Sequence, residues 1–209
     1  MAKFPQPPPR NALTGYPPDE ALLAQGTLLW RIYHRGGPHP TAWNTFRRYG
    51  PTASRFDHHA PPPRVQDRGV LYTVANVATC IAEFFQETRT IDPGRRQPWL
   101  AAFRITRAVR LLSLRGNWPT QAGASMNINS GSRERARHWS IAIYEAFPAI
   151  QGLLYCSSMD ANERAVVLYE RAEDGMPARP EMNKPLAAPD LAMVLEQAAD
   201  RFGYGLVVP

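Results

Sequence analysis

The sequence is poor in cysteine and contains no long apolar run. Its 209 residues include two cysteines, Cys80 and Cys156, too few for a disulfide framework, and no C-x-x-C pair occurs. We therefore expect two reduced, buried thiols in a cytoplasmic protein. No stretch approaches the roughly 18 apolar residues of a membrane span. The opening residues lack the apolar core of a secretory signal.

Motifs for common cofactors are also missing. The chain has no G-x-G-x-x-G after a predicted strand, no G-x-x-x-x-G-K-[ST] loop and no G-x-S-x-G turn. Its five histidines form no H-E-x-x-H motif and no Cys/His cluster, so we expect no metal site.

The basic charge is carried almost entirely by arginine. The 24 basic residues outnumber 18 acidic ones for a net charge of +6, and only Lys3 and Lys184 are lysines, which leaves 22 arginines. Arginine is the better fork for phosphate and carboxylate, but a compositional bias would give the same excess. The positive charge keeps a nucleic-acid-binding domain open as a hypothesis. Against it, the arginines are scattered and no RNP-type or helix-turn-helix pattern occurs.

Proline divides the chain into a tail and a domain. Prolines cluster in 1–18, which predicts an extended, weakly ordered segment, so we expect an N-terminal arm over 1–24 and one domain over 25–209. A second cluster in 36–68 is interrupted by aromatic residues and predicts a packed loop. A loop of this length is either functional or a scaffold.

The remaining segments predict more strands than helices. Asn76 and Ser132 are candidate N-caps for helices, the second over 133–146, and Gly203 is expected to end an amphipathic helix over 191–202. Residues rich in β-branched and aromatic side chains predict strands at 27–33, 69–75, 101–106, 109–114, 151–157, 164–170 and 205–208. Strands and helices do not alternate regularly, so we expect an α+β domain of mixed, mostly antiparallel sheets with flanking helices.

Two charged residues lie inside apolar segments. Arg31 interrupts a predicted strand, and a buried arginine needs a partner, either a protein carboxylate or a ligand phosphate. Glu83 lies in the helix that follows Asn76, off its apolar stripe, where a solvated helix face is the simplest interpretation.

Four further polar residues are weaker candidates. Tyr72 lies in mid-strand, where a tyrosine is ordinarily part of the core. Ser157 and Ser158 end a strand and could be turn residues. Arg55 could be an ordinary surface arginine.

Taken in order, these residues resemble the RES domain family. The resemblance rests on Trp-Arg-Ile at 30–32, Ser-Arg-Phe-Asp at 54–57, Val-Leu-Tyr-Thr-Val-Ala at 70–75, Ala-Glu at 82–83 and Gly-Leu-Leu-Tyr-Cys-Ser at 152–157. It covers about residues 25–172, leaving a C-terminal helix and strand over 189–208 unmatched. Each motif is short, but the five occur in the family's order and spacing.

The resemblance implies a bacterial toxin that degrades NAD+, with a fold similar to ADP-ribosyltransferase toxins. It implies that Arg31, Glu83 and Ser157 are the family's catalytic arginine, glutamate and serine. Arg31, Arg55, Tyr72 and Ser157 would bind NAD+, which is the substrate and not a cofactor. Ser54, Asp57 and Cys156 depart from the family pattern of glycine, asparagine and proline, and the last departure leaves Ser157 and Ser158 as alternatives.

The implied partner is a helix-turn-helix antitoxin of the Xre type, with no direct contact to nucleic acid or membrane, and the oligomeric state stays open. Cleavage of the nicotinamide–ribose bond develops positive charge on the ribose, which a carboxylate such as Glu83 would stabilise. Water as acceptor gives hydrolysis and phosphate gives phosphorolysis. Transfer to a protein, which is ADP-ribosylation, is the alternative.

Overall fold

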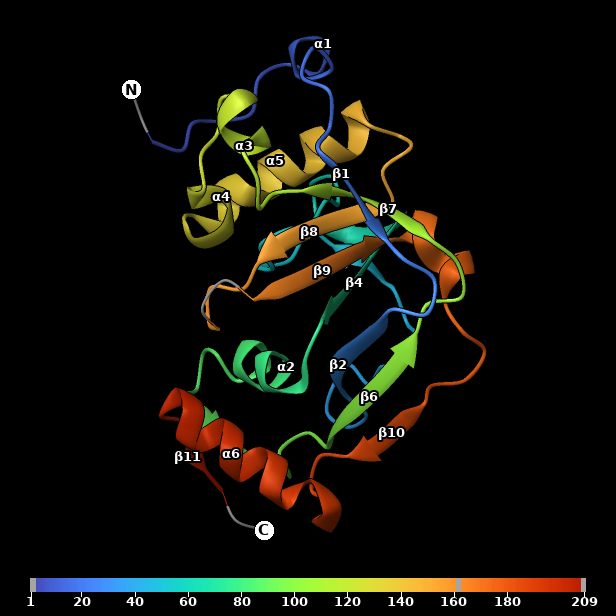
Figure 1. Cartoon of the computed structure of the whole chain (residues 1–209), viewed down its shortest axis with the longest axis vertical. Helices are drawn as coiled ribbons and strands as arrows, with labels where there is room; N and C mark the ends of the chain where they lie inside the picture. Colours follow the sequence, from blue (N-terminus) through green and yellow to red (C-terminus); the bar gives the residue numbers. More distant parts are fainter. Residues whose placement is uncertain (1–2, 161–162, 208–209) are drawn as a thin grey trace.

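The computed structural model describes residues 3–160 and 163–207, which fold around one nine-stranded, mostly antiparallel sheet and a separate two-stranded sheet (Figure 1). The strands of the large sheet are β1 (Glu20–Leu23), β2 (Leu28–His34), β3 (Arg47–Gly50), β4 (Arg64–Val74), β6 (Pro98–Arg104), β7 (Val109–Ser113), β8 (Gly152–Cys156), β9 (Arg164–Tyr169) and β10 (Met182–Pro185). The small sheet pairs β5 (Thr90–Ile91) with β11 (Gly205–Leu206).

The helices gather at the two ends of the molecule, with one between them (Figure 1). They are α1 (Arg10–Leu13), α2 (Val77–Phe84), α3 (Trp118–Gln121), α4 (Asn127–Ser130), α5 (Arg133–Ala146) and α6 (Ala192–Phe202), with short 3-10 helices at Glu170–Gly175 and Pro189–Leu191. Helices α1, α3, α4 and α5 lie at one end, and α6 lies at the other end beside α2. None of the helices in the described part of the chain is long and apolar enough to cross a membrane.

The sheet confirms the predicted α+β class. Its order is β1-β7-β8-β9-β4-β2-β6-β10, with β3 on the edge of β4, and only β7 and β8 pair in parallel among the described strands of this sheet. Most predicted strands are present with shifted ends, whereas β1, β3, β5 and β10 were not expected. Those four run for two to four residues and lack the longer alternation that signals a strand.

The helix signals read from the sequence are confirmed. The Asn76 side chain accepts a hydrogen bond from the Thr79 backbone at the start of α2, and Ser132 accepts one from Arg135 at the start of α5. Gly203 ends α6 with φ 64°, a left-handed conformation that favours glycine. The predicted strand at 205–208 is present at Gly205–Leu206, and Val208 lies outside the described residues.

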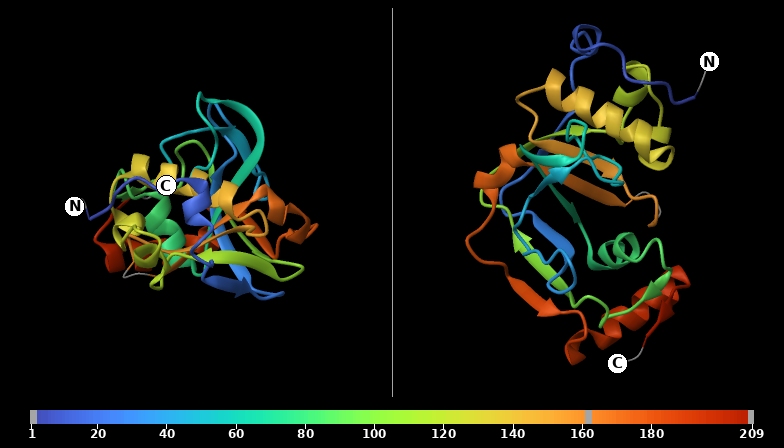
Figure 2. Two further views of the ribbon diagram at one scale, coloured as in Figure 1. Left: turned by 90° about the horizontal axis from the view of Figure 1, so that it is seen from above. Right: turned by 180° about the vertical axis from the view of Figure 1, so that it is seen from behind.

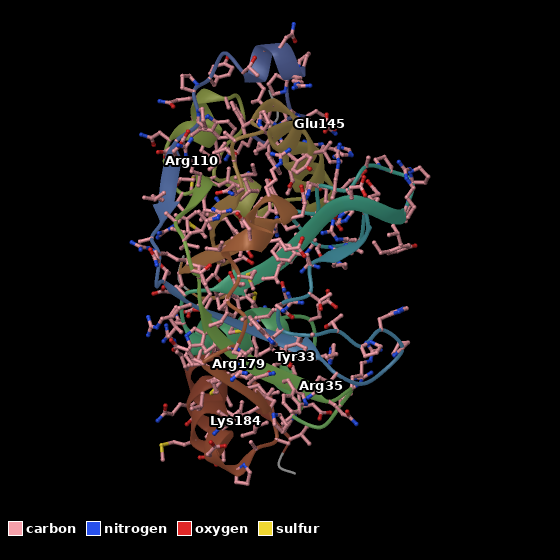
Figure 3. All side chains as sticks on the ribbon, turned by 90° about the vertical axis from the view of Figure 1, so that its right-hand side faces the viewer. Tyr33, Arg35, Arg110, Glu145, Arg179 and Lys184 are labelled. Atoms are coloured by element: carbon pink, nitrogen blue, oxygen red, sulfur yellow. The ribbon has the colours of Figure 1, made fainter. Side chains whose placement is uncertain are left out.

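Alternation along the strands gives the sheet two apolar faces. On β4, Val70 and Val74 belong to the larger core that includes the helices, whereas Leu71 belongs to a smaller core on the other face. The loop between β2 and β3 covers that smaller core with Trp43 and Phe46. Trp43, Phe46 and Phe56 of the proline-rich segment are therefore packed, as the sequence predicts, whereas Tyr49 is 53% exposed. Tyr33, labelled in Figure 3, reaches β10, where its hydroxyl donates to Asn183 at 2.7 Å.

One edge of β4 changes partner along its length. Near its end Val74 pairs with Trp30 of β2, the only pair that joins these two strands in the described structure. Further back, Val70 pairs with Arg47 of β3. Tyr72 lies between the two pairs, so the sheet is open at this position. The opposite edge of β4 is continuously paired with β9 from Val70 to Val74.

The N-terminal segment differs from its prediction. The described part of 1–18 is not a loosely attached tail, because Phe4 and Leu13 are buried and Leu13 is fully inaccessible. The Trp139 indole of α5 donates to the Pro5 carbonyl at 2.9 Å. The prolines remove donors but leave carbonyls that helix side chains bind, and their composition alone does not reveal these acceptors. The right-hand view of Figure 2 shows this segment running beside α5.

Replacement of Leu13 tests this packing. Leu13→Ala is expected to lower the free energy of unfolding by about 3 kcal/mol, the usual loss for a fully buried leucine. Leu22→Ala is the control, because Leu22 is 67% exposed, and its effect should stay below about 0.5 kcal/mol. Urea denaturation measures both, and equal stabilities for the two variants would contradict the packed arrangement.

Candidate active site

A pocket of about 320 Å³ opens where β2 and β4 separate. This volume is at the lower end of the range for small-molecule sites. The pocket is lined by residues from β2, β4, α2 and the loops beside them: Trp30, Arg31, Ile32, Ser54, Arg55, Tyr72, Thr73, Val74, Cys80, Glu83, Phe84, Gln86, Asn129, Arg133, Tyr155 and Ser158. Four of the five residues predicted for the site therefore share one cavity.

Glu83 is held by the predicted serine. The Ser157 hydroxyl donates to Glu83 Oε1 at 2.5 Å, joining the end of β8 to the last turn of α2. Gln86 Nε2 donates to the Glu83 carbonyl at 2.8 Å. Glu83 is therefore not on a solvated helix face but on the pocket wall, with a fixed carboxylate.

Ser157 stands behind Glu83 and not in the pocket lining. It is 2% exposed, and its oxygen accepts hydrogen bonds from the backbone N–H groups of Met159 at 3.1 Å and Asp160 at 3.2 Å. A hydroxyl has one proton and two acceptor positions, so these bonds and the one to Glu83 occupy it fully. In this state Ser157 orients the carboxylate, while the neighbouring Ser158 is exposed in the pocket lining.

Arg31 reaches the pocket through the open part of the sheet. It donates to the Thr45 carbonyl at 3.2 Å and has no carboxylate partner among residues 3–160 and 163–207. Burial lowers the pKa of Arg31 to about 10, so it stays protonated at neutral pH. The structure therefore does not supply the protein carboxylate that was one of its two expected partners.

Arg55 and Arg133 add two further guanidinium groups to the lining. Arg55 donates to the Gly131 carbonyl at 2.6 Å, and its pKa is lowered by burial and then by the nearby Arg133. Arg133 donates to Gln86 at 2.9 Å and pairs with Glu87 at 3.2 Å. The charged residues of the lining are three arginines and one glutamate, a net charge of +2 that favours an anion.

A buried turn around Asp57 holds Arg55 in place. The Asp57 carboxylate accepts from Thr52, from Arg47 at 2.9 Å and from His59 at 2.5 Å. These bonds hold the pKa of Asp57 well below its usual range although burial opposes them. Arg47 supplies the permanent positive charge beside this buried carboxylate.

Tyr72 places an unpaired hydroxyl in the pocket. The hydroxyl is buried and makes no hydrogen bond of ordinary geometry in the described structure; burial raises its pKa, and the nearby Ser54 side chain and Phe56 backbone oppose that rise. A buried polar group without a partner is costly, and such groups often mark sites where a ligand binds. The ring packs against the larger core, so the core interpretation holds for the ring and not for the hydroxyl.

The sequence did not single out Arg133, Gln86 or Asn129. Arg133 is one of 22 arginines and follows the helix cap Ser132, so neither the arginine content nor its position marks it as a site residue. Asn129 supports the site by accepting from the Cys156 backbone at 3.2 Å and donating to the Leu114 carbonyl at 3.0 Å. Both cysteines are buried and free, and burial raises the pKa of Cys80, in the pocket wall, to about 12. No group of three or more His, Cys, Asp or Glu side chains that could hold a metal lies in the described part of the chain.

Removal of two tyrosine hydroxyls distinguishes a paired group from an unpaired one. Tyr72→Phe should leave the free energy of unfolding unchanged or raise it, because its hydroxyl has no partner. Tyr144→Phe should lower it by about 1 kcal/mol, because that hydroxyl donates to Glu170 at 2.6 Å. Urea denaturation compares the two, and an equal loss for both would show that the Tyr72 hydroxyl is already satisfied.

Comparison with known proteins identifies the fold and the family of this chain. The chain is similar in fold to the crystal structure of the M. tuberculosis MbcT–MbcA toxin–antitoxin complex, with a TM-score of 0.58 and 16% sequence identity over 90% of this chain and 96% of that one. No curated protein matches it in sequence. The family model for the RES domain matches residues 28–193, which include every predicted site residue. This chain therefore belongs to the RES domain family.

Proposed function

We propose that this chain is a cytoplasmic toxin that cleaves the nicotinamide–ribose bond of NAD+ and so depletes cellular NAD+. The observation that carries the proposal is the single pocket carboxylate, Glu83, fixed by Ser157 in a lining with three arginines. A carboxylate for the ribose and guanidinium groups for the diphosphate are the two features that this reaction requires.

Binding would use the positive charge of the lining. The diphosphate of NAD+ is an anion, and Arg31 has no carboxylate partner among the described residues that would compete for it. Among the described residues, Arg55 donates a hydrogen bond only to the Gly131 carbonyl, so part of its guanidinium remains available. The Tyr72 hydroxyl would gain its missing partner from the nicotinamide ribose or amide.

Cleavage would depend on Glu83. The C–N bond breaks with its electron pair leaving on nicotinamide, and the ribose becomes oxocarbenium-like. A carboxylate already held in place stabilises that charge without reorganising. It therefore lowers the free energy of the transition state more than that of the ground state. Oxygen from water or phosphate then bonds to the anomeric carbon, and water loses a proton in the process. NAD+ is the substrate, and no further cofactor takes part.

The proposal includes a cognate antitoxin of the helix-turn-helix type. The similar solved structure contains a toxin together with its antitoxin. A protein that covers the pocket opening would keep NAD+ out, and this chain would then contact its partner rather than nucleic acid.

Loss of the carboxylate charge is the direct test. Glu83→Gln is expected to lower kcat for nicotinamide release from NAD+ by about 10²–10⁴-fold, the usual range for a positioned charged catalytic group. Glu145→Gln is the matched control, because Glu145 is an exposed residue of α5 that pairs with Arg68 and does not line the pocket. Figure 3 shows it at the end of the molecule where α5 lies. Equal activity in the two variants would refute the role of Glu83.

The products distinguish the acceptors. Purified protein and NAD+ are incubated with and without inorganic phosphate, and the ribose product is identified by mass spectrometry. Hydrolysis gives ADP-ribose under both conditions, whereas phosphorolysis gives ADP-ribose 1-phosphate only with phosphate. Intact NAD+ under both conditions, with the protein folded, would overturn the proposal, and labelling of a protein would replace it with ADP-ribosylation.

A further inference from the structure

The C-terminal segment 192–206 holds helix α2 at both of its ends. This segment comprises α6 and β11, and α6 packs along α2 (Figure 1). The family match ends at residue 193, so nearly all of the segment lies beyond it. Glu83 lies on α2, which makes the attachment of this helix relevant to the reaction.

The first attachment is at the beginning of α2. Thr79, whose backbone N–H bonds the Asn76 cap, donates its hydroxyl to Asp160 at 2.5 Å. Arg201 of α6 donates to the other oxygen of Asp160 at 2.7 Å. The side chain of Asp160 is 2% exposed, whereas that of Arg201 is 53% exposed. Asp160 is therefore a buried carboxylate held between two helices.

The second attachment is at the end of α2. The Tyr204 hydroxyl donates to the Ala82 carbonyl at 3.2 Å, one of the carbonyls that the end of a helix leaves without an intrahelical partner. Glu83 is the next residue. Gly205 also donates to the Arg89 carbonyl, so β11 follows the chain beyond α2.

Asp160 is also connected to the Glu83 carboxylate through Ser157. The Asp160 backbone N–H donates to Ser157 Oγ, and the Ser157 hydroxyl donates to Glu83. A displacement of Asp160 would therefore move both the helix that carries Glu83 and the hydroxyl that orients it.

We propose that Asp160, Arg201 and Tyr204 are positioning residues for Glu83, and that the C-terminal segment 192–206 is part of the apparatus for NAD+ cleavage. The inference rests on the proposed function for its kinetic consequence. Among the described residues, loss of Arg201 leaves the buried Asp160 carboxylate with the Thr79 hydroxyl as its one partner, which costs more than loss of an exposed ion pair. The change acts first on the turn at 157–160, which contains none of the three pocket arginines.

Steady-state kinetics test the positioning role. Arg201→Gln and Tyr204→Phe should each lower kcat about tenfold, because a small displacement of a catalytic group has effects of this order or greater. KM should change by less than about threefold, since the binding arginines are untouched. Arg201→Lys should recover most of the loss. Arg104→Gln is the matched control, because Arg104 pairs with Glu181 at 2.7 Å and both side chains are half-exposed.

Hydrogen exchange tests the attachment without using NAD+. Backbone amides of 80–85 should exchange at least about threefold faster in Arg201→Gln than in wild type or Arg104→Gln. Faster exchange with lowered kcat supports the inference. Wild-type exchange overturns it, and so does faster exchange with wild-type kcat. If wild-type protein cleaves no NAD+, the proposed function fails, and the exchange rates then decide whether the segment holds α2.

Discussion

The site depends on one break in the hydrogen bonding of the sheet. The edge of β4 pairs with β2 at Val74 and with β3 at Val70, and Tyr72 between them has neither partner. A continuous ladder at this position would bring β2 against β4 and close the pocket. Because the strands diverge, Arg31 reaches the cavity from a strand whose neighbouring residues pack on both faces of the sheet.

The charges around this opening are balanced only in part. Asp57 is buried and Glu170 is partly buried, and each carboxylate accepts from several donors. Hydrogen bonds lower the pKa of both although burial opposes them, that of Glu170 to about 2. By contrast, Arg31 and Arg55 have carbonyl partners, and burial lowers the pKa of both. The scaffold thus satisfies its buried acids and leaves positive charge at the pocket, where an anionic substrate would complete the balance.

Local signals predicted much of this fold. Asn76, Ser132 and Gly203 marked helix ends because each residue performs its capping through its own side chain or backbone conformation. The short strands β3 and β10 were missed because their pairing depends on neighbours distant in sequence. The packing of the N-terminal segment was missed for the same reason, since α5 supplies its donors.

The sequence predicted which residues belong to the candidate site but not how they are arranged in space. Motif order identified Arg31, Glu83 and Ser157, but only the structure shows that Ser157 lies behind Glu83 rather than in the pocket lining. Asp160 follows Ser157 closely and carries no motif, so its contacts with Thr79 and Arg201 could not be read from the sequence. These contacts span 81 and 41 residues and form only when the chain is folded.

The most direct measurement of the central claim is a crystal structure of Glu83→Gln with NAD+, a variant expected to bind the substrate without cleaving it. The account predicts intact NAD+ in the pocket, with its diphosphate on Arg31 and Arg55 and its nicotinamide ribose beside residue 83. NAD+ bound elsewhere, or a pocket that stays empty at saturating NAD+, would contradict it.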